Sequence, residues 1–296
     1  MKKIFIYAMT ALCLTACQQA DLSEDAIRQE QQEKTKKFTF HVKGAFQADY
    51  ADMSRAAVRL EDNNTACITD LWALDYAIVP GESSPVLAQQ VHQSPNDEAF
   101  GMVTMNLAYG SHVIKFIASK GDTPVLSASA LSWAKVKDTF TLDYPVEVVA
   151  SSNGNRAPEL KRAISDLQIS MTDVVPAEAT AVKVKLSKHY KSLLLPSLAT
   201  GESSEYENTF TLSSANIGKG LNFHTYTLCP SSEAWKADVT VTAIGQNSTA
   251  LSTFTIKDVE LKQNRSTILK GEVFSRGSGF SILIDDTWDE GVNVEF

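Results

Sequence analysis

Apolar and polar residues alternate with a period of two along most of the chain from residue 38 onward. The pattern begins at residues 38–42, where two phenylalanines and a valine alternate with a threonine and a histidine. Successive side chains of a β-strand point to opposite faces, so this period is typical of strands buried on one face. Further stretches with this pattern or a strong β composition are 68–76, 100–107, 112–119, 139–149, 167–171, 182–186, 221–228, 239–244, 254–261, 267–274 and 280–284.

Many short strands separated by clusters of Ser, Asn, Gly and Lys predict an all-β fold of β-sandwiches with Greek-key connections. A chain of 296 residues, 44% of them hydrophobic, is long enough for two cores. Turn-forming residues concentrate at 151–158, so we expect an N-terminal β-sandwich over 38–152 and a C-terminal one over 157–296. A single short helix containing a tryptophan is expected over 126–137.

The first seventeen residues are typical of a bacterial lipoprotein signal. Two lysines precede an apolar run over residues 4–14, and small residues stand directly before Cys17. The run is too short to span a bilayer. We expect cleavage between Ala16 and Cys17, removal of residues 1–16 with Cys13, and a covalent lipid on the Cys17 thiol as the one attached group. The alternative is an ordinary secretory signal followed by a chance cysteine.

Residues 17–37 are predicted to form a lipidated, flexible tether, because they are polar and offer no apolar stripe to bury. A flexible coil of this length spans on the order of 25 Å. Loss of the signal leaves 25 basic against 35 acidic residues. A chain this acidic is a poor partner for nucleic acid and needs its lipid to stay on a membrane.

No catalytic or metal-binding motif is found in the sequence. The five histidines are scattered without zinc-ligand spacing, and there is no nucleophile elbow, Walker loop or dinucleotide fingerprint. We therefore expect no enzymatic activity, no metal and no cofactor other than the lipid. Cys67 and Cys229 are expected to be two buried thiols, with a disulfide between them as the alternative.

A glycan-binding surface lipoprotein is the alternative function. Tryptophan rings can stack on sugars, and the candidates for such a platform are Trp133, Trp235 and Trp288. A fourth tryptophan, Trp72, lies in an alternating strand and is expected to belong to the core.

Motifs spread over nearly the whole mature chain resemble those of the fimbrillin-like lipoproteins of Bacteroidota, in particular the FimB-type fimbrial anchor or minor subunits. The matching stretches are 68–76, 107–121, 138–140, 152–156, 259–274 and 285–288. The resemblance implies two tandem transthyretin-like β-sandwich domains and a location on the outer membrane at the cell surface. It also implies a role in a fimbria or pilus, with other fimbrial subunits as partners and a host or bacterial surface ligand as a further one.

The resemblance further implies a route of assembly. Polymerising subunits of such a family are cut at an arginine, lose their first strand, and accept a strand from a neighbour, whereas an anchor subunit keeps its lipid. The arginines available here are Arg28, Arg55 and Arg59. A cut after Arg55 or Arg59 would separate the strand at 38–42 from the body, and a cut after Arg28 would only free the lipid. The uncut anchor is favoured, with the cut stalk or tip subunit as the alternative.

Overall fold

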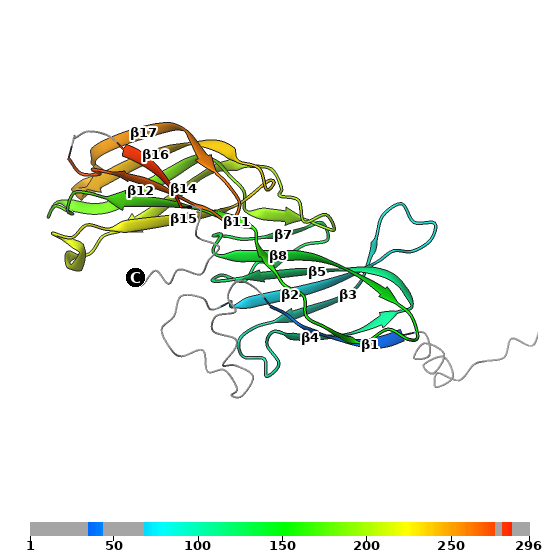
Figure 1. Ribbon diagram of the computed structural model, residues 1–296. Coiled ribbons are helices and arrows are strands. Elements are labelled where there is room, and N and C mark those ends of the chain that lie inside the picture. The colour runs from blue at the N-terminus through cyan, green and yellow to red at the C-terminus, as the bar shows by residue number, and fades with distance from the viewer. Residues whose placement is uncertain (1–34, 44–67, 276–279, 286–296) are drawn as a thin grey trace, which may run out of the picture. The chain divides into compact units, whose positions relative to one another are not determined.

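The computed structural model describes residues 35–43, 68–275 and 280–285, and this part of the chain is almost entirely β-structure (Figure 1). Its only helical elements are two 3-10 turns, η3 (Ser214–Asn216) and η4 (Gln246–Ser248). None of the described residues belongs to a helix long and apolar enough to cross a membrane. The predicted all-β sandwich fold is confirmed, while the division into domains at residues 152 and 157 stays a prediction.

Two sheets enclose the core of the N-terminal half. The first is antiparallel and has the strand order β10 (Lys161–Arg162), β8 (Thr139–Val148), β5 (Gly110–Ser119), β2 (Asp70–Ala77) and β3 (Val86–Gln93). The second has the order β4 (Met102–Ala108), β1 (Thr35–His41) and β9 (Asn155–Arg156). Burial alternates strictly along β4, as the period of two predicts for a strand with one face on a core.

Two four-stranded sheets enclose the core of the C-terminal half. One has the order β14 (Ser204–Thr211), β12 (Ala179–His189), β16 (Trp235–Gly245) and β17 (Ala250–Leu261). The other has the order β15 (Asn222–Leu228), β11 (Ile164–Met171), β18 (Ser266–Gly271) and β19 (Phe280–Asp285). The chain crosses between these sheets several times, so that β11 and β18 are parallel neighbours although they are far apart in sequence.

The prediction of a helix over residues 126–137 is wrong. The segment forms a hairpin of β6 (Val125–Leu126) and β7 (Ala130–Ser132), and β7 pairs on its other side with β13 (Ser192–Leu194). Ser127 explains the difference, because its backbone N–H donates to the carbonyl of Ala130 (2.8 Å) and its hydroxyl accepts from the Ala130 N–H (3.0 Å). Serine closes such turns with its side chain, which competes with helix formation.

Candidate functional site

β1 is the middle strand of its sheet although it comes first in the chain. Its neighbours, β4 and β9, belong to later parts of the sequence, and β9 runs parallel to it. The N–H of Thr39 donates to the carbonyl of Gly154 (2.7 Å). Just after β1, the N–H of Lys43 donates to the carbonyl of Pro158 (2.8 Å), and the carbonyl of Lys43 accepts from the N–H of Leu160 (2.7 Å). The backbone partners of β1 thus come from segments far from it in the sequence.

The inward side chains of β1 and the residue after it fill a deep apolar slot. Phe38 and Phe40 are fully buried, and Val42 is nearly so. The ring of Phe40 meets those of Phe116, on β5 (5.3 Å between centroids), and Tyr144, on β8 (6.0 Å), both edge-on. Burying a phenylalanine contributes about 1.5–3 kcal/mol, so these side chains hold β1 firmly and would leave an open slot without it.

Gly154 and Arg156 shape the side of the slot next to β9. A methyl group on Gly154 would lie 2.3 Å from the carbonyl oxygen of Lys37, so only glycine lets this segment approach β1. The guanidinium of Arg156 lies over the ring of Phe38, 5.2 Å from its centroid. Sequence reasoning identified this segment as turn-forming and did not foresee that it pairs with the first strand.

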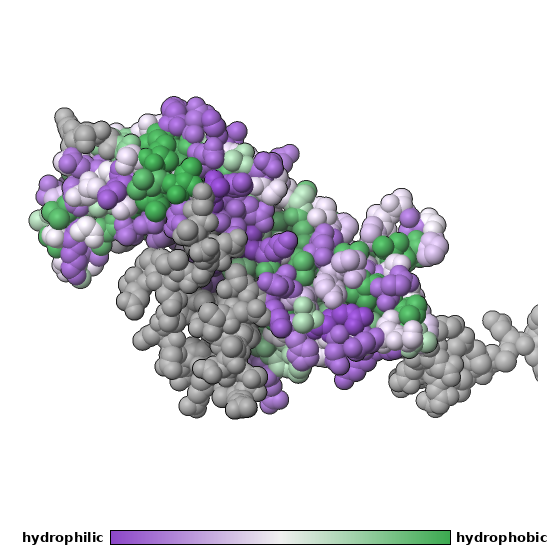
Figure 2. All heavy atoms as spheres, in the orientation of Figure 1, coloured by the Kyte–Doolittle hydropathy of each residue, from purple (hydrophilic) through white to green (hydrophobic). Residues whose placement is uncertain are grey.

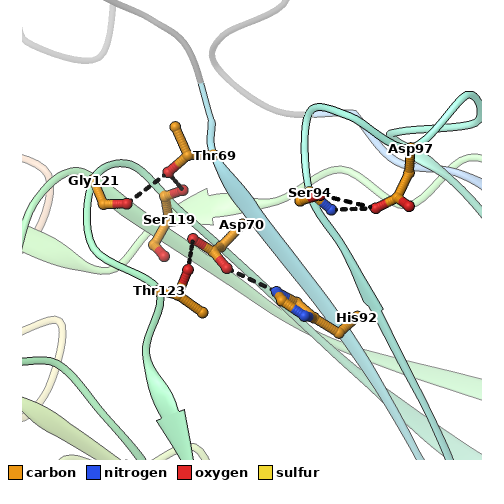
Figure 3. A network of polar contacts seen from close by, with 8 residues as sticks. All are labelled: Thr69, Asp70, His92, Ser94, Asp97, Ser119, Gly121 and Thr123. Atoms are coloured by element: carbon orange, nitrogen blue, oxygen red, sulfur yellow. Dashed lines mark hydrogen bonds and ion pairs between the residues drawn. The ribbon is translucent and has the colours of Figure 1, made fainter.

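A polar network fixes the beginning of β2, the strand that follows residues 44–67 (Figure 3). The buried carboxylate of Asp70 accepts hydrogen bonds from His92 Nε2 (2.7 Å) and Thr123 Oγ1 (3.2 Å). The hydroxyl of Thr69 donates to the carbonyl of Gly121 (2.9 Å). These contacts fix the entry to β2 without any residue of β1.

The same network lacks the geometry of a hydrolase triad. Such a triad needs a serine hydroxyl hydrogen-bonded to the histidine that the aspartate orients. Figure 3 draws two serines, and neither hydroxyl is hydrogen-bonded to His92: that of Ser94 donates to Asp97 (3.1 Å), and that of Ser119 is buried without a hydrogen-bond partner. Within the part of the chain that the structure describes, no three His, Cys, Asp or Glu side chains gather in a way that could hold a metal ion.

Two buried histidines hold strands together. His112 Nδ1 lies 2.7 Å from Asp75 Oδ1, and this hydrogen bond is the largest of the effects that raise the pKa of His112. His189 donates from Nε2 to the carbonyl of Tyr226 (3.0 Å) and stacks on Tyr206. Burial lowers the pKa of His189 to about 4, so this imidazole is neutral at pH 7. Through these contacts both histidines have a structural role.

Two of the three tryptophans predicted as a glycan platform, Trp133 and Trp235, lie in the described part of the chain. Trp133 is 2% exposed and packs in a cluster with Leu131 and Leu193, so its ring offers no face to a sugar. Trp235, on β16, is half-buried and meets the ring of Tyr190 edge-on at 5.2 Å.

Cys229 has a free thiol whose pKa is raised to about 12, chiefly by burial. The remaining predicted positions lie outside the described residues: Ala16, Cys17, Arg28, Arg55, Arg59, Cys67 and Trp288.

A family model matches residues 125–295, which is more than half of the chain. The chain belongs to DUF6562, a family of unknown function. The match covers both C-terminal sheets together with the β6–β7 hairpin and β8. No curated protein matches this DUF6562 chain.

Solved structures similar to this DUF6562 protein come from Bacteroidales. A DUF1812 protein of Bacteroides thetaiotaomicron, described as a candidate for polysaccharide binding, has a TM-score of 0.52 at 8% identity, covering 85% of this chain and 96% of that one. The fimbrial anchor protein Mfa2 of Porphyromonas gingivalis has a TM-score of 0.47 at 11% identity, and the match covers 84% of this chain and 97% of that one. The tip fimbrial protein Mfa3 of the same organism has a TM-score of 0.44 at 13% identity, and the match covers 85% of this chain and 100% of that one. The likeness to the DUF1812 protein indicates a similar fold and nothing about function.

Proposed function

We propose that this protein is a lipid-anchored structural subunit of a bacterial surface fimbria that assembles by strand addition. The observation that carries the proposal is the placement of β1. It is a central strand, it fills an apolar slot with two fully buried phenylalanines, and all its partners come from distant parts of the chain. A sheet that lacks such a strand exposes unpaired backbone groups and an apolar groove, and a strand from a neighbour satisfies both.

The sequence before β1 supports the membrane end of the proposal. A lipid on Cys17 and a polar tether would hold the folded part a short distance outside a lipid surface, and the acidic chain gains no attraction from anionic headgroups. The protein would thus sit at the outer membrane and face the outside of the cell. Other fimbrial subunits would be its partners.

The role within the fimbria is proposed to be that of a FimB-type anchor or minor subunit. An anchor keeps its lipid and its own first strand, so its slot stays filled and growth stops at the membrane. Cleavage after Arg55 or Arg59 would instead free the body from lipid and β1 together, as a stalk or tip subunit requires. No catalytic group is assigned: Ser94, His112 and His189 each have a structural partner.

Mass spectrometry of the protein taken from cell envelopes tests this assignment. We expect an intact chain whose first residue is Cys17 and whose mass includes two or three acyl chains. A new N-terminus after Arg55 or Arg59 would show a cut, polymerising subunit. An unmodified Cys17 on a soluble, monomeric chain would contradict the proposed function altogether.

A further inference from the structure

The last described strand, β19, exposes three consecutive large apolar side chains. Ile282, Leu283 and Ile284 are 46%, 50% and 45% exposed. β19 lies at one edge of its sheet among the described strands, next to β18 only. Figure 2 shows an apolar patch on the molecule where this strand, red in Figure 1, lies. An exposed apolar edge strand invites pairing with another strand.

Two of these side chains point toward the core. Ile282 is paired with Leu269 and Ile284 with Thr267, and both partners on β18 are buried. Residues directly opposite each other in antiparallel strands project from the same face of the sheet. Ile282 and Ile284 therefore have the orientation of core residues, yet almost half of each is exposed. The core of the C-terminal sandwich is incomplete along this edge.

The edge of the facing sheet has the same character. β17 lies at that edge, and its residues Phe254 and Ile256 are only partly buried. Phe254 meets Phe280, on β19, edge-on with 5.6 Å between the ring centroids. The two edge strands thus border an apolar seam, defined here by Phe254, Ile256, Phe280, Ile282 and Ile284.

The chain that follows β19 has the sequence to fill the seam. Residues 286–290 carry four polar or charged side chains beside Trp288 and have the length of a five-residue hairpin loop. In residues 291–296, Val292, Val294 and Phe296 alternate with Asn293 and Glu295. A loop of this length would set residue 291 opposite Asp285. The same register would set Val292 opposite Ile284, Val294 opposite Ile282, and Phe296 opposite Phe280.

We propose that residues 291–296 of this chain dock as an added antiparallel strand on β19 and close the seam between β19 and β17. All three apolar residues of the segment then face the core, while Asn293 and Glu295 face solvent. A slip of one residue would turn Glu295 toward the core, and burying an unpaired carboxylate is costly, so this face of the segment must be the inner one. The five-residue loop then selects this register among those that keep that face inward. This inference concerns the C-terminal sandwich and does not depend on the proposed exchange of β1.

Engineered cysteines test the proposed register. In the full chain with Cys13→Ser, Cys17→Ser and Cys67→Ser, the pair Ile282→Cys and Val294→Cys places two thiols opposite each other. We expect an intrachain disulfide on mild oxidation, in at least fivefold greater yield than for the mismatched pair Ile282→Cys and Asn293→Cys. Cys229 stays in both chains, since its buried thiol, with a pKa of about 12, resists oxidation.

Equal yields from the two pairs would overturn the proposal. Disulfides between chains would also overturn it, because they would show that a second copy supplies the strand.

Hydrogen exchange tests the same strand without cysteines. The substitution Val294→Asp should speed exchange at least tenfold at those β19 amides that point away from β18, because it places a carboxylate on the core side of the added strand. Asn293→Asp is the matched control, since it adds the same charge one residue away on the solvent side, and it should leave these amides unchanged. Fast exchange of these amides in the unchanged chain would contradict the proposal even if every variant folds.

Discussion

The chain with Phe40→Ala is expected to unfold with a free energy about 3–5 kcal/mol lower than that of the unchanged chain. Phe40 is fully buried, and its ring contacts those of Phe38, Phe116 and Tyr144. Alanine removes these contacts and leaves a cavity between the two N-terminal sheets, which rigid strands can only partly close. Denaturant unfolding followed by circular dichroism and tryptophan fluorescence measures the loss.

Thr39→Ala is the matched control for Phe40→Ala. Thr39 directly precedes Phe40 on β1, points to the other face of the strand and is partly exposed. Its hydroxyl makes only a 3.5 Å contact with the hydroxyl of Thr104. The expected loss is below about 1 kcal/mol. Similar losses for the two variants would mean that the slot around Phe40 does not hold β1.

Replacement of Cys17 by serine is expected to move the protein from the membrane fraction to the soluble fraction completely. Serine has no thiol to accept the lipid, and a mature chain with 25 basic and 35 acidic residues has no other means of staying on an anionic membrane. Fractionation of cells followed by detection of the protein measures the effect.

Cys13→Ser provides the comparison for Cys17→Ser. Both are cysteine-to-serine changes within the same short segment, but Cys13 lies within the predicted signal and leaves with it. This variant should stay on the membrane like the unchanged chain. Release of both proteins, or of neither, would remove the basis for a lipid on Cys17.

Most of the fold was predictable because half-buried strands leave a local pattern. The alternation of Phe38 and Phe40 with polar residues correctly indicated β1 and which of its faces is buried. A local pattern does not reveal the partner of a strand. Gly154 and Arg156 looked like part of a linker, and their contact with β1 depends on the approach of segments more than 100 residues apart.

The wrongly predicted helix has a similar cause. Leu126, Leu131, Trp133 and Val136 are apolar residues in a short segment, and periodicity alone does not separate a short buried strand from a buried helix. The side-chain hydrogen bond of Ser127 and the pairing of β7 with β13 decide in favour of strands, and the second of these is a tertiary contact. The same limit applied to β19, whose exposed core-facing residues become apparent only from its pairing with β18.

Strand complementation tests the central claim most directly. A chain that begins at residue 44 lacks β1 and should show an N-terminal half that no longer unfolds cooperatively. Addition of a synthetic peptide of residues 35–43 should restore cooperative unfolding at one peptide per chain, since it brings back the two buried phenylalanines and the backbone hydrogen bonds of β1. The same peptide with Phe38→Asp and Phe40→Asp should have no effect. A shortened chain that is as stable as the full one, or that ignores the unchanged peptide, would contradict the account.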